Sequence, residues 1–545
     1  MELIGVILSM LVAVVASGIL VRSIPLALPT PLVQIGLGAV IAAVPSLPDV
    51  HLDPDVFFLL FLPPLLFLDG WRIPKEGLLQ DRATILQLAF GLVIFTVIGM
   101  GVFIHWMIPP IPYPVAFALA AIISPTDPIA VSAIAARVPM PKRVMHILEG
   151  ESLLNDASGL VCFRFAVAAA LTGRFSFSAA SVTFLGLVVG GIAAGTGLTY
   201  AVMRGKDWVS QRLGEQAGSQ VLISLLIPFG AYELAEHVGA SGILAAVSAG
   251  ITMSYMELNG RALASTRVQR TAVWDTMQFA LNGVMFVLLG EQLPGILSGA
   301  VRVVQDTHHL NPGWLAVYAL AINFGLACLR FIWVWVSVNL ARYLARRRGE
   351  PPTVRPSVRL IAAMSVAGVR GAITLAGVLT VPLALDNGEP FPARDLMIFL
   401  AAAVIIVSLL AASIGLPRLL VGIAMPTDSL AEDERYRARS IAAQAAVRAI
   451  ERASHEMARD HTDADLYAEA AARVMDLYRR RFEGEMTAEN AAHIRRGNEI
   501  ERALRLAGVN AEREALFALA RTDALSQENS RKLIRELDLM EERLQ

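Results

Sequence analysis

Long apolar runs, separated by short polar stretches, repeat along the chain from its first residues to about residue 425. A membrane-spanning helix needs roughly 17–25 mainly apolar residues, because it rises about 1.5 Å per residue through a hydrocarbon core about 30 Å thick. The pattern therefore predicts thirteen transmembrane segments. They are expected at residues 2–22, 31–47, 54–70, 84–107, 113–136, 143–171, 178–204, 216–238, 240–256, 270–293, 314–342, 357–383 and 394–422.

The positions of arginine and lysine predict how these segments are oriented. Short loops that are rich in these residues stay in the cytoplasm. The odd-numbered loops carry most of them, whereas the even-numbered loops carry only Arg174, Arg302 and Arg394. We therefore expect the N-terminus outside the membrane and the C-terminal tail in the cytoplasm.

The thirteen segments can be divided into two six-helix units of opposite orientation, segments 1–6 and 8–13, which segment 7 joins. Segment 5 then corresponds to segment 12, and each contains a sequence that breaks a helix. Pro125-Thr126-Asp127-Pro128 interrupts the segment near 113–136, and Gly368-Val369-Arg370-Gly371 interrupts the segment near 357–383. Discontinuous helices at matching positions of inverted repeats are typical of the central site of a transporter.

The composition indicates a membrane body with a water-soluble extension. Of the 545 residues, 55% are hydrophobic and 17% are charged, the mean hydropathy is +0.57, and the charged residues concentrate after Met425. We therefore expect a membrane domain at residues 1–425 and a helical cytoplasmic tail at residues 426–545. A formal net charge of −1 argues against a nucleic-acid binder. The sequence contains no GxxxxGK[ST] phosphate loop and no cysteine/histidine cluster, so we expect a transporter without a cofactor rather than an enzyme.

The strongest candidate for ion chemistry lies in segment 6, in the run from Glu151 to Asp156. A charge at the centre of a bilayer costs about 2.5–3.5 kcal/mol on insertion scales, so it is seldom kept without a function or a partner. Asp156 falls about 20 Å along the helix from Arg143, near the midplane. Ser152 and Asp156 share one helix face, as do Glu151 and Asn155. Their hydroxyl, amide and carboxylate oxygens suit alkali cations and protons rather than soft metals.

Four further residues extend this candidate site. Thr126 and Asp127 lie in the break of segment 5, where Thr126 is a candidate ligand and Asp127 is either a ligand or a cap of the half-helix end. Arg370 needs an anionic partner, and Glu151 is the expected one, in a structural pair that ties segment 6 to segment 12. Asp69 closes segment 3 and is either a site residue or a helix-end carboxylate.

Four sequences resemble the signatures of the sodium/proton exchangers, the NhaP- and NHE-like members of the monovalent cation:proton antiporter family. They are Phe61-Leu62-Pro63-Pro64-Leu65-Leu66-Phe67-Leu68-Asp69, Pro125-Thr126-Asp127-Pro128, Glu151-Ser152-Leu153-Leu154-Asn155-Asp156 and Gly368-Val369-Arg370-Gly371-Ala372. Within this family the chain most resembles the bacterial YjcE-type exchangers, which share the run from Glu236 to Ala246. The resemblance implies an inverted-repeat fold with crossed, unwound helices and a homodimer in the bacterial cytoplasmic membrane.

The resemblance also implies roles for individual residues. Asp156 would bind the cation and the proton in turn, by alternating access. The further ligands and core residues would be Ser152, Thr126, Asp69, Asp127 and Asn155, and the structural ion pair would be Glu151 with Arg370. The asparagine beside Asp156 is implied to accompany one-for-one, electroneutral exchange of Na⁺ for H⁺, with Li⁺ as another candidate substrate.

Three alternatives stay open from the sequence. A potassium-preferring antiporter of the same fold would use the same oxygen ligands. A cation channel is less favoured, because no tandem filter sequence is present. A membrane sensor acting through the tail is the third, and the tail itself is either regulatory or a simple soluble extension.

Overall fold

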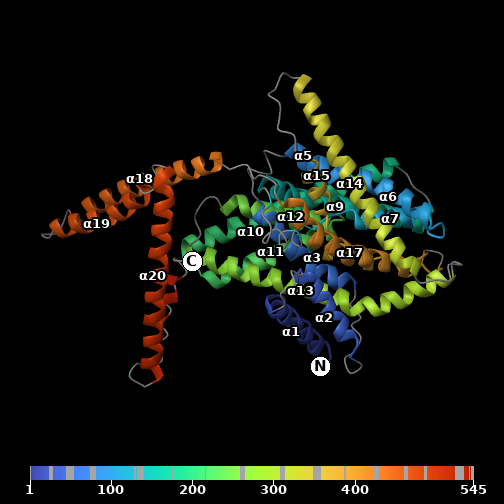
Figure 1. Cartoon of the computed structure of the whole chain (residues 1–545), viewed down its shortest axis with the longest axis horizontal. Helices are drawn as coiled ribbons and strands as arrows, with labels where there is room; N and C mark the ends of the chain where they lie inside the picture. The colour runs from blue at the N-terminus through green and yellow to red at the C-terminus, as the bar shows by residue number, and fades with distance from the viewer. Residues whose placement is uncertain are drawn as a thin grey trace. The chain divides into compact units, whose positions relative to one another are not determined.

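The computed structural model contains two compact units, Met1–Met425 and Pro426–Gln545 (Figure 1). The structure describes residues 2–23, 29–44, 54–73, 82–127, 131, 140, 142–173, 177–214, 216–257, 264–306, 313–347, 357–385, 388–421, 429–458, 464–483, 488–521, 533–534, 536–538 and 540–541. Within these residues the regular elements are helices, and the one bridge between extended residues joins Ala384 to Pro390.

The helices of the first unit follow the expected segments, and each expected segment contains at least one of them. In chain order they are α1 (Glu2–Ser23), α2 (Thr30–Ala42), α3 (Pro54–Arg72), α5 (Arg82–Leu86), the π-helix η1 (Gln87–Leu92), α6 (Val93–Met107), α7 (Tyr113–Ile123), α9 (Lys142–Thr172), α10 (Phe177–Leu213), α11 (Ala217–His237), α12 (Gly242–Glu257), α13 (Ala264–Asp306), α14 (Gly313–Arg347), α15 (Val358–Val366), α16 (Ala372–Leu379) and α17 (Arg394–Leu420).

Among the described residues, eight stretches are helical, long and apolar enough to cross a membrane. They are α1, the continuous α5–η1–α6 rod, α9, α10, α11, α13, α14 and α17, while α2 and α7 are shorter apolar helices. The expected all-helical polytopic fold is therefore confirmed. The count of thirteen crossings and the inverted repeat stay predictions.

Both expected helix interruptions are present, and they lie against each other. The first follows the end of α7 at Ile123, where residues 124–127 are not helical, and the second separates α15 from α16. The backbone N–H of Asp127 donates a hydrogen bond of 2.7 Å to the carbonyl oxygen of Val369. Most of the remainder of segment 5, to residue 136, lies outside the described residues.

Glycines allow pairs of helices to pack backbone against backbone. A Cβ on Gly38 of α2 would lie 1.9 Å from the carbonyl oxygen of Val287 in α13, and one on Gly290 of α13 would lie 1.9 Å from that of Ile35 in α2. A reciprocal pair of glycines joins α3 to α12 in the same way. Small residues matter here because lipid gives little hydrophobic drive for helix association, so close van der Waals packing has to supply it.

A buried polar cluster ties together helix ends that the sequence orients toward the cytoplasm. The indole nitrogen of Trp71, at the end of α3, donates to Glu257 Oε2 at 2.9 Å, and Arg270 Nη2 of α13 lies 2.6 Å from Glu257 Oε1, at the end of α12. The side chains of Arg270 and Glu257 are only 3% and 19% exposed. These three ends are expected on one side of the membrane, and the structure brings them together.

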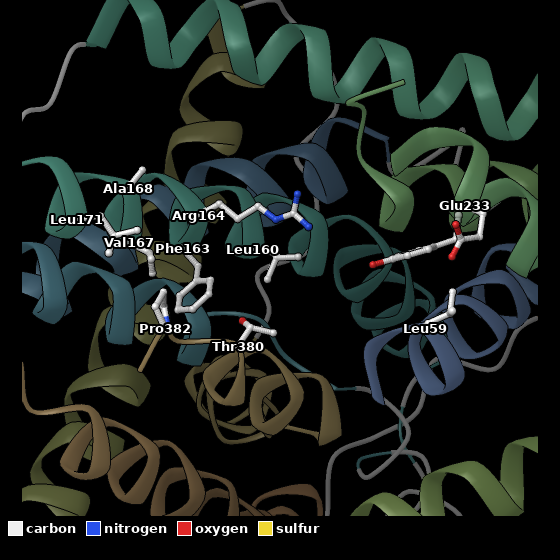
Figure 2. A pocket seen from close by; sticks show the side chains of 11 residues that line it. Leu59, Leu160, Phe163, Arg164, Val167, Ala168, Leu171, Glu233, Thr380 and Pro382 are labelled. Carbon is white, nitrogen blue, oxygen red and sulfur yellow. The ribbon is translucent and has the colours of Figure 1, made fainter. Parts of the chain in front are cut away.

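A cavity of about 570 Å³ lies among helix ends that the sequence orients outward (Figure 2). Its walls come from the first turns of α3, the last turns of α9 and α11, and the residues that follow α16. They include Leu59, Leu160, Phe163, Arg164, Tyr232, Glu233, Thr380 and Pro382. Four elements that are far apart in the sequence thus meet at one end of the helices. The loop charges predict that this end faces outward.

The second unit is helical, as expected for the tail. It contains α18 (Ser429–Ala458), α19 (Ala464–Glu483) and α20 (Ala488–Arg521), followed by short helical stretches within residues 533–541. The Ser454 hydroxyl of α18 donates to the carbonyl oxygen of Tyr467 in α19 at 3.4 Å. Arg513 of α20 pairs with Asp538 at 3.1 Å and with Glu541. These contacts hold α19 against α18 and the last helical stretches against α20.

The close approach of α2 and α13 predicts that Gly38→Ala destabilises the protein. The added methyl group would meet the carbonyl oxygen of Val287, and overpacking of this kind costs about 1–3 kcal/mol. Gly36→Ala is the matched control, because Gly36 lies two positions away on the same helix and a Cβ added there would have no atom within 4 Å. We expect a lower melting temperature in detergent for the first variant only. Equal melting temperatures would contradict the packing.

Candidate functional site

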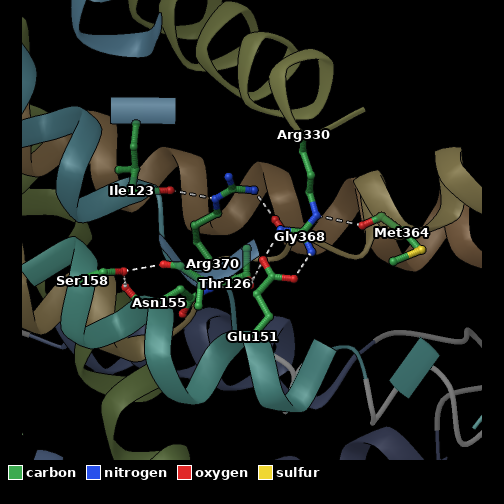
Figure 3. Close-up of polar contacts among 10 residues, drawn as sticks. Ile123, Thr126, Glu151, Asn155, Ser158, Arg330, Met364, Gly368 and Arg370 are labelled. Carbon is green, nitrogen blue, oxygen red and sulfur yellow. Dashed lines mark hydrogen bonds and ion pairs between the residues drawn. The ribbon is translucent and has the colours of Figure 1, made fainter. Parts of the chain in front are cut away.

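The two helix interruptions cap each other with side chains of complementary charge. Arg370 Nε donates a hydrogen bond of 2.9 Å to the carbonyl oxygen of Ile123, the last residue of α7 (Figure 3). The Asp127 carboxylate lies against Gly371, the N-cap of α16, where an added Cβ would be 2.0 Å from Asp127 Oδ2. A helix C-terminus carries partial negative charge and an N-terminus partial positive charge. The cation and the anion therefore each face the end that stabilises them.

This geometry favours one of the two interpretations of Asp127. Its backbone is fixed by Val369 and its carboxylate lies at the start of α16, which is the placement expected of a cap. The other interpretation, in which this carboxylate is itself a ligand of an ion, stays a prediction.

Arg370 is held mainly by backbone and hydroxyl groups rather than by Glu151. Besides the bond to Ile123, its Nη1 donates to the carbonyl oxygen of Gly368, and its backbone N–H donates to the Ser408 hydroxyl at 3.1 Å. The residue is only 5% exposed. Carbonyl oxygens of unwound backbone thus supply the partners that a buried guanidinium needs.

The expected pairing of Glu151 with Arg370 is wrong, because the structure pairs Glu151 with Arg330 of α14. Arg330 Nη1 and Nη2 lie 2.5 Å and 2.6 Å from the two carboxylate oxygens of Glu151. The side chains are 3% and 1% exposed, and Arg330 Nε also donates to the carbonyl oxygen of Met364 at 3.0 Å. A guanidinium and a carboxylate match best as a two-pronged fork, and Arg330 reaches Glu151 in that geometry.

Arg330 is a site residue that the sequence motifs do not identify. It lies outside all of them, inside a segment that is otherwise apolar from residue 314 to about residue 340. A signal was nevertheless present, since an arginine in the middle of an apolar span requires a partner inside the protein.

Thr126 connects the first interruption to the polar face of α9. Asn155 Nδ2 donates to Thr126 Oγ1 at 3.0 Å, and Thr126 Oγ1 lies 3.5 Å from Glu151 Oε1. This arrangement leaves Asn155 Oδ1 buried without a hydrogen-bond partner among the described residues. A buried acceptor of this kind is rare in folded proteins, and it is one of the oxygens that the sequence proposed for the site.

A π-helical turn in segment 4 anchors the same region of α9. Ser158 Oγ donates to the carbonyl oxygen of Ala89, in η1, at 2.6 Å, and also approaches that of Asn155 at 3.0 Å. Short π-helical turns inside α-helices are rare and often occur at functional sites. The sequence predicted a regular helix here, because nothing in the apolar run 84–107 indicates the wider turn.

Asp156 lies in the middle of α9 and is only 6% exposed. Its carboxylate is close enough to Asp127 and Asp69 to interact electrostatically with both, and Asp69 interacts with Asp127. Among the described residues, no hydrogen bond or ion pair satisfies the Asp156 side chain. A buried carboxylate with acidic neighbours and no counter-ion is costly unless it takes up a proton or a cation.

The remaining predicted residues lie near this carboxylate. Ser152 is buried on α9 one turn before Asp156, and Asp69 is partly buried near the end of α3. No group of three or more His, Cys, Asp or Glu in the described chain is arranged to hold a metal ion together. Whether Asp127 and Asp69 share a bound ion with Asp156 stays a prediction.

The chain is similar in sequence to membrane exchangers over most of its length. Residues 7–422 match the family described as "Sodium/hydrogen exchanger, transmembrane". The chain is 40% identical over 546 residues to YjcE, an uncharacterised Na⁺/H⁺ exchanger of Escherichia coli strain K12, covering 99% of this chain and 98% of that protein. It is 44% identical over 424 residues to a sodium, potassium, lithium and rubidium/H⁺ antiporter of Bacillus pumilus, covering 77% of this chain and 61% of that protein.

The fold is similar to that of a solved transporter. The sodium proton antiporter MjNhaP1 from Methanocaldococcus jannaschii, determined at pH 8, matches with a TM-score of 0.58 and 18% sequence identity. The match covers 78% of this chain and 99% of that chain. At this identity the likeness concerns the fold alone.

The pair formed by Glu151 and Arg330 predicts a large penalty for removing one partner. Arg330→Met would leave the Glu151 charge buried without its counter-ion, which costs about 3–5 kcal/mol. Replacing both residues, as in Arg330→Met with Glu151→Leu, should restore part of the lost stability. Melting temperatures of the purified variants measure this, with Arg359→Met of α15 as an exposed control. A double variant no more stable than Arg330→Met alone would contradict the pair.

Proposed function

Because the chain belongs to the sodium/hydrogen exchanger family, we propose that it exchanges Na⁺ or a similar alkali cation for H⁺ across the bacterial cytoplasmic membrane, at Asp156. The family consists of membrane antiporters, and the fold match to a sodium proton antiporter agrees with this. The four motifs that carry the resemblance in the sequence agree with the family match over residues 7–422.

The observation that carries the assignment to Asp156 is the unequal treatment of two acids on one helix. Glu151 has a two-pronged counter-ion in Arg330, whereas Asp156, five residues later, has no hydrogen bond or ion pair among the described residues. A carboxylate whose charge is already neutralised by a fixed arginine has little reason to take up a cation. Asp156 is therefore the group for which a proton and a sodium ion compete.

Obligatory exchange follows from the cost of the empty site. With a proton or a cation bound, Asp156 is neutral and can change its exposure from one face of the membrane to the other. Without either, it is a buried negative charge near Asp127 and Asp69, and moving it through a low-dielectric region is unfavourable. Each transition thus carries either the cation or the proton.

Asn155 bears on the stoichiometry. Its side chain is neutral and is held by Thr126, so it adds no second charge beside Asp156. A single carboxylate that carries one Na⁺ in one direction and one H⁺ in the other transfers no net charge. We therefore propose electroneutral, one-for-one exchange. We also propose that Ser152 and Thr126 contribute ligands to the bound cation, and that Asp69 lies near the site.

The wider assembly is proposed on the same basis. We expect a homodimer with the N-terminus outside, and with residues 426–545 forming a helical domain in the cytoplasm. Potassium is the second candidate cation, because the Bacillus pumilus relative is described as an antiporter of sodium, potassium, lithium and rubidium. Oxygen ligands of the kind present here accept all of these ions.

Asp156→Asn should abolish exchange while leaving the fold intact, because the amide keeps the size of the side chain but cannot hold a proton or balance a cation. The measurement is sodium-driven proton movement in proteoliposomes that contain a pH-sensitive dye. Asp395→Asn, at an exposed position at the start of α17, is the matched control and should exchange normally. Sodium-driven proton movement in Asp156→Asn equal to that of the unmodified protein would remove Asp156 from its role.

Electroneutral exchange predicts that the rate does not respond to membrane voltage. Proteoliposomes with an imposed diffusion potential of either sign, set with a gradient of a membrane-permeant organic cation instead of potassium, should exchange sodium for protons at the same initial rate as those without one. Acceleration by one sign and slowing by the other would show net charge movement and contradict the one-for-one stoichiometry.

A further inference from the structure

The outer cavity lies on the same face of α9 as Asp156. The residues of α9 that line it recur at helical spacing, at Leu160, Phe163, Arg164, Val167, Ala168 and Leu171. Asp156 precedes Leu160 by four residues and Phe163 by seven, so it continues the same stripe. One helical turn, roughly 6 Å along the axis, separates the carboxylate from the nearest residue of the cavity wall.

The wall of the cavity carries a permanent cation, Arg164, farther along α9 than this carboxylate. Arg164 extends from α9 past Leu160 toward the side of the cavity where Glu233 of α11 lies (Figure 2). Eight residues separate Arg164 from Asp156, or about 12 Å along the helix. An unpaired guanidinium at this position would repel an alkali cation that enters the cavity, because the two charges have the same sign.

Arg164 is, however, paired with a residue on another helix. Its Nη2 lies 3.5 Å from Glu236 Oε1, near the end of α11. The same oxygen accepts a hydrogen bond of 3.2 Å from the backbone N–H of Gly242, the first residue of α12. Glu236 is therefore anchored at the start of α12, and Glu233 and His237 approach each other nearby at 3.9 Å.

The pair joins two groups of helices that otherwise have few contacts with each other. α9 packs mainly against α7 and the α5–η1–α6 rod, whereas α11 packs against α10, α12, α13 and α3. The side chains of Arg164 and Glu236 are 46% and 35% exposed, so the pair is accessible and can open without leaving a deeply buried charge. A shift of one group against the other would break it.

We infer that the cavity is the outer entrance to the Asp156 site, and that Arg164 in its wall and Glu236 beside it form a latch. Closed, the latch holds the two helix groups together and narrows the route to the carboxylate, while Glu236 offsets the charge of Arg164. Open, it widens the route to the carboxylate. The inference rests on the proposed function and adds the route and the residues that control access to it.

Accessibility of a cysteine placed in the cavity tests this directly. In a parent protein with Cys162→Ser and Cys328→Ser, the variant Ala168→Cys places a thiol in the wall, and Ala169→Cys is the matched control one position off the stripe. Membrane-impermeant methanethiosulfonate reagents, one neutral and one cationic, are applied outside intact cells or to inverted vesicles. We expect Ala168→Cys to be labelled from outside only, and Ala169→Cys to stay largely unlabelled.

Variants of the latch separate its two effects. Arg164→Gln and Glu236→Gln should each speed labelling by the neutral reagent several-fold, because both break the pair. Labelling by the cationic reagent should be faster in Arg164→Gln. It should increase much less in Glu236→Gln, which leaves the guanidinium in the cavity. The exchanged pair Arg164→Glu with Glu236→Arg should return labelling by the neutral reagent toward the rate of the parent.

Unchanged rates in both single variants would overturn the latch. Labelling from the inner side, or no labelling at all, as for a cavity filled by a lipid chain, would overturn the entrance. Because labelling needs no transport, the exchange activity of the same cysteine-free parent is measured in parallel. Absent exchange with the expected labelling would count against the proposed function alone, and normal exchange without the labelling pattern against this inference alone.

Discussion

The contact between two interrupted helices is the constraint on which the site depends. Unwound backbone inside a membrane has polar groups that lipid cannot satisfy, so it persists only where protein or a water-filled cavity supplies partners. Here each interruption supplies hydrogen-bond partners for the other. The N–H of Asp127 bonds to Val369, the Arg370 guanidinium bonds to the end of α7 at Ile123, and the Asp127 carboxylate faces the start of α16. Gly371 is required because a side chain there would displace that carboxylate.

This contact leaves the two acids of α9 in different environments. Arg370 is occupied by carbonyl oxygens, so Glu151 obtains its counter-ion from Arg330 on α14. The pair fixes α9 against α14 and neutralises one of the two acids. Asp156 has neither a counter-ion nor a hydrogen bond among the described residues, and Asp127 and Asp69 lie nearby. The buried charge that the fold leaves uncompensated is thus the one best suited to exchange a proton for a cation.

Local sequence predicted the parts of this arrangement that local physics determines. Apolar runs located the helices, and the proline pair around Thr126 and Asp127 and the glycines around Arg370 located the interruptions. An acid at the middle of an apolar span made Asp156 the candidate for ion binding. Local sequence could not predict which arginine pairs with Glu151. Glu151 and Arg330 are 179 residues apart, and only the packing of α14 decides between Arg330 and Arg370. The π-helical turn at Ala89 likewise depends on its contact with Ser158 rather than on its own sequence.

Counting protons released when the cation binds tests the shared carboxylate most directly. Purified protein in weakly buffered detergent solution is titrated with NaCl at a series of pH values, with choline chloride as the ionic-strength control. The account predicts that release approaches one proton per bound Na⁺ as the pH falls into the range where Asp156 is protonated, and that Asp156→Asn releases none. Sodium binding without proton release at every pH, or undiminished release from Asp156→Asn, would contradict it.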